Sequence, residues 1–379
     1  MQIVASPREI VVAGAGIVGC AIADELSRRG ASVVVVDDRA PGMGATQAAA
    51  GVLAPFIEAR HEGPLFELTA RSLGLFDDFI ARTQADSAAK LTYQRTGTLD
   101  VALDSDALAV LVKAHERLTS RGIEADLLDG RAVGQCEPNL SNGALGGLLI
   151  PTHGFVAAAE LTRALAAAAE RRGATFVDGR ITRITQDGDR LRLQESSSST
   201  SSILRADAVI VAAGSWSGAI QIEGVRTPTP VRPVRGQLLH LHWAGAEPLR
   251  RILWSERCYV VPWPDGTVLV GATVEDAGFD ERTTLAAILD LIDAVCELLP
   301  QAWTASLMAA KVGLRPGTPD EVPIIGWSGA VPNLMYATGH YRNGILLAPL
   351  TAELVANAVL DGRIDPMLEL TRPQRFGEL

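Results

Sequence analysis

The amino-acid sequence predicts an α/β fold in which a nucleotide-binding domain is interrupted twice by a β-rich α+β domain. Three features lead to this prediction. Residues 10–38 read as strand, glycine-rich turn, helix and strand, whereas residues 231–271 carry the two-residue periodicity of β-strands. Residues 333–362 then return to a strand followed by a helix. The first domain is therefore expected to combine sequence from both ends of the chain.

The glycine-rich turn has the spacing G-x-G-x-x-G, formed by Gly14, Gly16 and Gly19, and follows a short apolar run. In a βαβ unit the first glycine makes the tight turn, the second lets the backbone approach a pyrophosphate, and the third brings helix and strand close together. A helix starting near Ile17 would direct its amides and its positive dipole end at that anion. We therefore predict a Rossmann-like dinucleotide site here.

The next strand, residues 33–36, is entirely β-branched and ends at Asp37, followed by Asp38. An acidic side chain at this position can accept hydrogen bonds from the ribose hydroxyls and would repel a 2′-phosphate. A bare glycine motif also occurs in ordinary turns, and the motif does not distinguish FAD from NAD. The strand, helix, second strand and acidic terminus together favour dinucleotide binding over a plain βαβ turn.

Further elements follow in order along the chain. Thr46 is expected to start a short helix of small residues reaching Gly51, which would serve either tight packing or contact with a flat ligand. Residues 64–85 predict one long amphipathic helix, and residues 157–172 a second helix capped by Gly173. The run 208–218 is expected to be a buried strand that ends in a small-residue turn at the cofactor edge.

The change in pattern gives the domain limits. Residues 1–88, 151–225 and 322–379 are assigned to the nucleotide-binding domain, and residues 89–150 and 226–321 to the β-rich substrate domain. Within the latter, a Pro-Asp-Gly sequence predicts a hairpin. The polar run 195–202 is interpreted as a solvated turn between strands.

Composition excludes several classes of protein. The net charge is −10 with no basic tract, so nucleic acid is not an expected partner. The beginning of the chain lacks the features of a signal peptide, and no window holds the apolar residues needed for a membrane span, so we expect a cytoplasmic protein without stable membrane anchoring. The four cysteines and six histidines lack ligand spacing, which favours four buried thiols and no metal.

Several motifs carry a resemblance to a known family. ATQAAAGVLAP, AVIVAAGSWSG, CYVVPW, GLRPGTPDEVPIIG and GHYRNGILLAP follow the fingerprint in the order found in FAD-dependent amine and D-amino acid oxidases, and look most similar to the bacterial glycine oxidases of thiamine biosynthesis. The resemblance spans residues 8–365. It implies a D-amino acid oxidase-like FAD-binding domain with noncovalent FAD, because Gly313 to Arg315 fill the stretch where sarcosine oxidases attach flavin through cysteine.

The resemblance also assigns residues. Arg315 would bind the substrate carboxylate, Tyr259 would flank the substrate, and Arg342 would lie beside flavin and substrate. The FAD contacts carried over by motif are Ile17, Val18, Asp37, Asp38, Ala45, Thr46, Ala50, Gly51, Val52, Ile181, Arg342, Asn343, Gly344, Ile345, Leu346 and Leu347. Asp37 replaces the more usual Glu, and Arg257 and Val274 stand where glycine oxidase has His and Met.

The residue chemistry agrees with these roles. A guanidinium among the apolar neighbours of Arg315 needs an anionic partner, and its planar fork suits a carboxylate. The alternatives are an internal salt bridge of Arg315 to Asp320 or Glu321, a packing role for Tyr259, and a surface position for Arg342. The amides after Arg342 begin a helix whose positive end would stabilise negative charge on a reduced flavin.

The functional prediction is oxidation of a small amino acid or amine, with glycine first and sarcosine or small D-amino acids as further candidates. Oxygen would be the acceptor, giving peroxide, and the imine would hydrolyse to a 2-oxo acid and ammonia or supply thiazole synthesis. Two other readings stay open. One is a dehydrogenase that passes electrons to a quinone or protein acceptor, and the other is a non-catalytic or NAD-binding protein. A homo-oligomer is expected.

Overall fold

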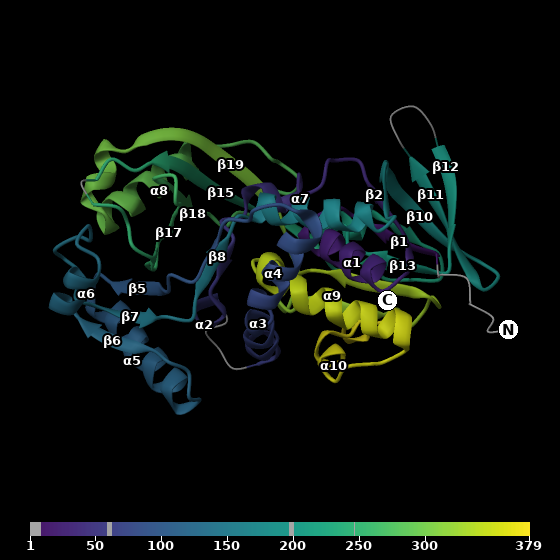
Figure 1. The fold of residues 1–379 in the computed structure, drawn as a ribbon, viewed down its shortest axis with the longest axis horizontal. Helices are drawn as coiled ribbons and strands as arrows, with labels where there is room; N and C mark the ends of the chain where they lie inside the picture. Colours follow the sequence, from purple (N-terminus) through teal and green to yellow (C-terminus); the bar gives the residue numbers. More distant parts are fainter. Residues whose placement is uncertain (1–8, 59–62, 197–200, 246) are drawn as a thin grey trace.

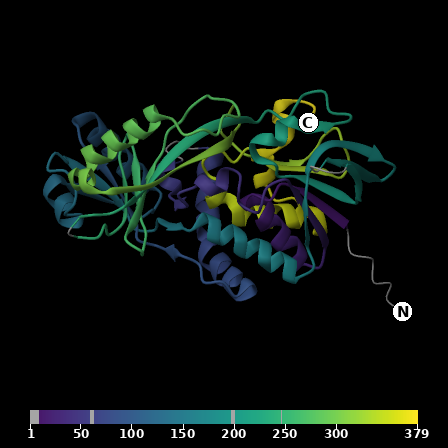
Figure 2. The same ribbon diagram turned by 90° about the horizontal axis from the view of Figure 1, so that it is seen from above.

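The fold consists of two parts side by side, each built on its own sheet (Figures 1 and 2). The computed structural model describes residues 9–58, 63–196, 201–245 and 247–379. One part holds a six-stranded sheet and the beginning and end of the described chain. The other holds an eight-stranded sheet made from the middle of the chain.

The six-stranded sheet forms the nucleotide-binding half. Its strands, in spatial order, are β20 (Ile324–Trp327), β21 (Leu334–Thr338), β13 (Ala208–Val211), β1 (Glu9–Ala13), β2 (Ser32–Asp37) and β9 (Thr175–Asp178). All neighbours pair in parallel except β20, which is antiparallel to β21. The apolar runs predicted for these strands are explained by burial on both faces. The predicted return of the chain to this sheet near its end is confirmed.

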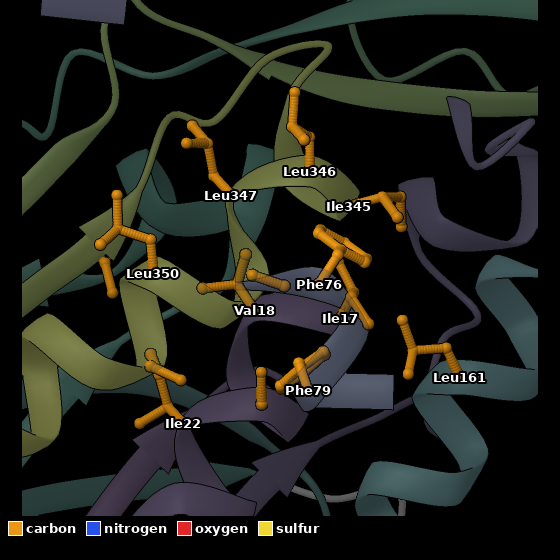
Figure 3. Packing of buried hydrophobic residues seen from close by; sticks show 14 of the residues in the cluster. Ile17, Val18, Ile22, Phe76, Phe79, Leu161, Ile345, Leu346, Leu347 and Leu350 are labelled. Carbon is orange, nitrogen blue, oxygen red and sulfur yellow. The ribbon is translucent and has the colours of Figure 1, made fainter. Parts of the chain in front are cut away.

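Helices cover one face of this sheet, and a small, mainly antiparallel sheet covers the other. Helix α1 (Ile17–Arg28) lies between α7 (Ala158–Arg171) and α9 (Gly344–Asp361), and Figure 3 shows their apolar side chains packed together. On the opposite face pack β10 (Arg180–Asp187), β11 (Arg190–Ser196), β12 (Ser201–Ala206) and β14 (Gln221–Ile222). Successive residues of β1 pack alternately against the helices and against the small sheet, because neighbouring side chains of a strand point to opposite faces.

Helix α9 is long and apolar enough to pass a length and composition test for a membrane span. It is the one helix in the described residues that does so. However, 78% of its apolar window is buried inside the fold. It lies against α1 and α3 (Pro64–Gly74), which is the environment of a core helix.

The eight-stranded sheet forms the other half. Its spatial order is β19 (Ser306–Gly317), β15 (Arg232–His242), β18 (Thr267–Gly271), β17 (Tyr259–Pro262), β16 (Ile252–Trp254), β5 (Thr98–Ala102), β7 (Gly146–Ile150) and β6 (Asp126–Asp129). The helices α5 (Ser105–Ser120), α6 (Gly130–Cys136) and α8 (Leu285–Leu298) pack against it. The predicted Pro-Asp-Gly hairpin is confirmed, because β17 and β18 pair antiparallel across it.

The chain changes sheets close to the predicted domain limits. A three-stranded sheet of β3 (Val52–Leu53), β8 (Gly154–Val156) and β4 (Tyr93–Gln94) lies where the chain leaves and re-enters the nucleotide-binding half. The later changes fall between β14 and β15 and between β19 and β20. The exact limits stay a prediction.

Two predicted helices differ from the structure. Residues 64–85 form two helices, α3 and α4 (Phe76–Ser87), because the chain breaks at Leu75 after Gly74, a residue of low helix propensity. The expected helix from Thr46 to Gly51 is a 3₁₀ turn, η1 (Ala45–Ala48), and Ala49 is already extended. Gly51 has φ +71° and its carbonyl accepts the Val156 amide, so pairing to β8 replaces helical bonding there.

The cysteine prediction is correct in part. All four thiols are free, and Cys20, Cys258 and Cys296 are buried. Cys136 is only half-buried, because it ends α6, a surface helix in which only Val133 is fully buried. The predicted solvated turn in the run 195–202 falls largely on residues 197–200, which lie outside the described residues.

The close contact between α1 and the first turn yields a stability prediction. A Cβ at Gly19 would overlap the Gly14 carbonyl oxygen, which is backbone and cannot move aside. Gly19→Ala should therefore lower the free energy of unfolding of the cofactor-free protein by about 3 kcal/mol.

The matched control is Gly16→Ala. Its Cβ would meet only Thr46 Oγ1 at 3.8 Å, and its φ of −69° suits alanine. The loss there should be about 1 kcal/mol, the size of a weakened helix cap. Thermal unfolding of both variants decides the matter, and equal losses would contradict the role assigned to Gly19.

Candidate active site

One deep cavity runs from the glycine-rich turn to the face of the eight-stranded sheet. Its wall at the first end is the turn between β1 and α1, where Gly14 has φ +116°. The Ile17 amide at the start of α1 donates to Thr46 Oγ1 over 3.3 Å. Gly16 lines the cavity, and Thr46 Oγ1, at 3.8 Å, is the nearest atom to a Cβ placed there, so the backbone is open on this side. This end has the geometry of a pyrophosphate cradle.

The acidic terminus of β2 lies beside this turn. Asp37 Oδ2 accepts the Ala15 amide at 2.6 Å, and Oδ1 accepts the Arg39 amide at 2.9 Å. Burial raises the pKa of Asp37, while those two amides partly offset the rise. The carboxylate is thus held by backbone and faces the cavity, with lone pairs suited to ribose hydroxyls. Asp38 forms an ion pair with Arg180 at the rim.

The small residues after Asp38 allow β19 to pack closely against this segment. Gly313 of β19 packs against η1, and a Cβ at Gly313 would lie 3.0 Å from the Ala48 Cβ and 3.1 Å from the Ala45 oxygen. The same turn also lines the cavity. Close packing on β19 is therefore confirmed, and contact of this segment with a flat ligand stays a prediction.

Arg315 and Tyr259 come together at the far end of the cavity. Arg315 lies on β19, and its guanidinium covers Gly236 of β15, where a Cβ would overlap it. Tyr259 pairs with Gly271 across β17 and β18, and its ring covers that glycine in the same way. Each large side chain thus lies over a glycine of the neighbouring strand. Both project from the sheet into the cavity.

The orientation of Arg315 is fixed by a backbone carbonyl. Its Nη1 donates to the Thr273 oxygen over 2.8 Å. Asp320, one of the two predicted salt-bridge partners of Arg315, accepts bonds from Arg375 at 2.8 and 3.3 Å, and these hold its pKa below the usual value despite burial. The structure therefore places Asp320 in a different ion pair.

The start of α9 closes the cavity on the flavin side of the predicted site. Arg342 is exposed and lines the cavity together with Gly344 and Ile345. Asn343 is buried as the residue before the helix, and Leu346 and Leu347 turn into the apolar core shown in Figure 3. Because successive residues of a helix point in different directions, Gly344 and Ile345 line the cavity while Leu346 and Leu347 face the core, so only part of the predicted run reaches the cavity.

The structure brings most of the predicted residues together. Those that line the cavity are Gly14, Gly16, Ile17, Val18, Asp37, Asp38, Ala45, Thr46, Ala50, Gly51, Val52, Ile181, Tyr259, Arg315, Arg342, Gly344 and Ile345. Four predicted residues do not line it: Gly19, Asn343, Leu346 and Leu347. Gly19 instead brings α1 against the first turn. No group of metal-ligating side chains occurs among the described residues.

Sequence reasoning missed other residues of the cavity wall. Ala212 to Trp216 line it; the run 208–218 was predicted to reach the cofactor edge, but none of its residues was assigned to the site. Arg39 also lines it and lies 4.5 Å over the Trp216 ring. His340 lines it as well; its burial lowers its pKa to about 3, so the ring is neutral at pH 7, and Nε2 lies 3.0 Å from Thr351 Oγ1.

Comparison with known proteins settles the family. Residues 9–358 match the model of the DAO family, described as FAD dependent oxidoreductase. The chain belongs to this family. Its cofactor is accordingly FAD, and the residues present fit that group: a glycine turn open to a pyrophosphate, the amides of α1, and Asp37 beside them.

Individual relatives are similar over nearly the whole chain. The chain is 32% identical to a glycine oxidase of Geobacillus kaustophilus, covering 93% of this chain and 92% of the relative. The crystal structure of glycine oxidase from that organism superposes with a TM-score of 0.89 at 28% identity, covering 95% and 96%. The chain is also 35% identical to the bifunctional protein ThiO/ThiG of a Nostoc species, over 95% of this chain. It spans 54% of that relative's length, about half.

The fold comparison extends to an enzyme with a different name. A crystal structure of iminodiacetate oxidase from Chelativorans sp. BNC1 superposes with a TM-score of 0.87 at 27% identity, covering 97% of this chain and 99% of that one. The architecture is therefore shared by oxidases whose names give different amino acids or amines.

Asp37 gives a test of the cofactor end. Asp37→Asn should weaken FAD binding about tenfold, because an amide has one acceptor oxygen where the carboxylate uses two, and charge-assisted hydrogen bonds are lost. Flavin fluorescence on titration of the cofactor-free variant measures this. Asp187→Asn is the control, since Asp187 forms an ion pair with Arg205 and does not line the cavity. A larger loss for the control would refute the assignment of Asp37.

Proposed function

We propose that this protein is an FAD-dependent oxidase of a small amino acid or amine, with glycine as the first candidate and sarcosine or small D-amino acids as others. The observation that carries the proposal is the convergence of Arg315 and Tyr259 on the same cavity that begins at the dinucleotide turn. The names of the relatives, glycine oxidase and iminodiacetate oxidase, support the same substrate class.

Arg315 holds the substrate carboxylate. Its guanidinium is already oriented by the Thr273 carbonyl, and its planar fork suits a carboxylate in two-point contact. Tyr259 bounds the other side of the substrate. Together they place the α carbon toward the middle of the cavity, where proximity and orientation supply much of the rate. Bound FAD would accept the hydride equivalent from that carbon.

The residues around the cofactor tune the charge of the site. The start of α9, with its positive dipole end and with Arg342 nearby, would favour negative charge on the flavin side. His340 is neutral and is engaged by Thr351, so it does not add a second positive charge. The proton on the substrate nitrogen is lost before the reaction, and its lone pair assists removal of hydride, so no side-chain base is needed at the α carbon.

The reaction balances with oxygen as acceptor. Loss of two electrons and two protons converts glycine to its imine, and oxygen takes them up as hydrogen peroxide. Water then hydrolyses the imine to glyoxylate and ammonia. The fused relative ThiO/ThiG supports a second fate, in which the imine is passed to thiazole synthesis. We place this chemistry in the cytoplasm, in keeping with four free cysteines, and retain a homo-oligomer as a prediction.

The decisive test measures peroxide formation with glycine, sarcosine, D-alanine and iminodiacetate. Oxygen consumption is compared with reduction of a dye in the absence of oxygen. We expect stoichiometric peroxide with at least one substrate. Dye reduction without oxygen uptake would replace the oxidase by a dehydrogenase that uses another acceptor, and a yellow protein inert toward the whole panel would remove the proposal.

Arg315→Ala should raise KM for the amino acid about a hundredfold while the FAD content of the purified protein stays unchanged. The reason is the loss of a two-point, charge-assisted contact with the carboxylate. Arg315→Lys keeps the positive charge but loses the planar two-point contact, so its KM should lie between that of the parent protein and that of Arg315→Ala. Steady-state kinetics and the ratio of flavin to protein absorbance check this. An unchanged KM in Arg315→Ala would disprove the carboxylate assignment.

A further inference from the structure

A partly buried polar network lies beside Arg315. The segment after β18 runs beside β15: the Thr273 amide donates to the Gln237 carbonyl at 3.2 Å, and the Gln237 amide donates to Thr273 Oγ1 at 2.9 Å. The Thr273 hydroxyl donates to Glu275 Oε1 at 2.5 Å. The carbonyl of this same Thr273 accepts from Arg315. The contacts of Thr273 with Gln237 and Glu275 therefore restrict the position of the carbonyl that accepts from Arg315.

Glu275 is the centre of this network. Its Oε1 accepts from Thr273 and from Gln237 Nε2 at 2.8 Å, and its Oε2 accepts from Arg235 Nε and Nη2 at 3.1 and 2.6 Å. The backbones of Arg235 and Glu275 also exchange two hydrogen bonds of 2.9 Å. Burial alone would raise the pKa of Glu275, but the bonds from Thr273, Arg235 and Gln237 outweigh it and lower the pKa. The group is an anion with both oxygens in use.

We propose that Glu275 and Thr273 are positioning residues for Arg315: they fix the Thr273 carbonyl and so hold the guanidinium in the orientation that receives the substrate carboxylate. Neither is a catalytic residue, and neither lines the cavity. This inference rests on the proposed function of Arg315 and adds the residues through which its orientation is set.

The physical argument is one of preorganisation. Arg315 extends over Gly236, so its guanidinium lies where a side chain of β15 would otherwise stand, and contacts at the end of the arginine contribute to its orientation. The Thr273 carbonyl fixes one nitrogen of the fork. A shift of that carbonyl turns the guanidinium away from two-point contact, and small misplacements of this kind weaken binding strongly.

The network also includes the start of α8, and this contact restricts the position of Gln237. Gln237 Nε2 donates to Thr284 Oγ1 at 3.0 Å, and Gln237 Oε1 accepts the Thr284 amide at 2.9 Å. Thr284 is the residue that caps α8. Hydrogen bonds therefore connect the residues around Arg315 to β15 and to the start of α8.

The chain offers two matched pairs of variants. Thr273→Val removes the hydroxyl with little change in shape, whereas Thr273→Ser keeps it. Glu275→Gln has one acceptor oxygen where two are in use, so the amide nitrogen must face donors on one side. Asp280→Asn is its control, because the Asp280 carboxylate also contacts Arg235 at 3.1 Å but accepts its other hydrogen bonds from Arg282.

The experiment uses the FAD-loaded protein and acetate as the probe of the carboxylate site. Changes in flavin absorbance on titration give Kd for acetate, and steady-state kinetics give KM and kcat for glycine. Thr273→Val and Glu275→Gln should raise both Kd and KM about tenfold, with FAD content and kcat little changed. Thr273→Ser and Asp280→Asn should stay within about twofold of the parent. Thermal unfolding measures any general loss of structure.

Two outcomes would overturn the inference: acetate binding unchanged in both Thr273→Val and Glu275→Gln, or equal weakening in Asp280→Asn. Arg315→Ala separates this from failure of the proposed function. If Arg315→Ala weakens acetate binding but Thr273→Val and Glu275→Gln do not, only the positioning role fails. If Arg315→Ala binds acetate like the parent, the carboxylate assignment itself fails.

Discussion

The structure depends on the placement of one guanidinium at the junction of two sheets. Arg315 extends from β19 into a cavity whose other end is the dinucleotide turn. A charged group in this position is tolerated only with hydrogen-bonding partners, and the Thr273 carbonyl supplies one of them. The neighbouring strand contributes Gly236, because any Cβ would overlap the guanidinium. The position of the Arg315 guanidinium therefore requires glycine at residue 236.

Much of the nucleotide-binding half could be predicted from sequence because its signals are local. The glycine spacing, the apolar strands and Asp37 lie within thirty residues, and backbone geometry relates them directly. The same holds for the hairpin of β17 and β18 and for helix α9 ending at Gly362, which has φ +64°. Arg315, Tyr259 and Arg342 were found through family motifs, and the structure brings all three to one cavity.

The remainder was not predictable because it depends on contacts between distant segments. Gly236 has no motif; its role is visible only once β15 pairs with β19. Gly51 ended the expected helix because β8 lies against it, and β8 is a hundred residues away in sequence. Leu346 and Leu347 belong to a run that touches the cavity, but helical geometry turns them into the core. A motif identifies a segment, and packing decides which of its side chains face the site.

One loop joins the two halves of the site. Residues 273–284 begin beneath Arg315, where Thr273 accepts from it, and continue to Glu281, which forms a two-point ion pair with Arg39 at 3.0 and 2.9 Å. Phe279 lies against Trp216, which in turn lies under Arg39 at the cavity wall. Since Arg39 follows the strand that ends in Asp37, the same loop contacts both the carboxylate clamp and the dinucleotide end. Substitutions in this loop are therefore constrained at both its ends, even where intervening side chains such as Val274 are exposed.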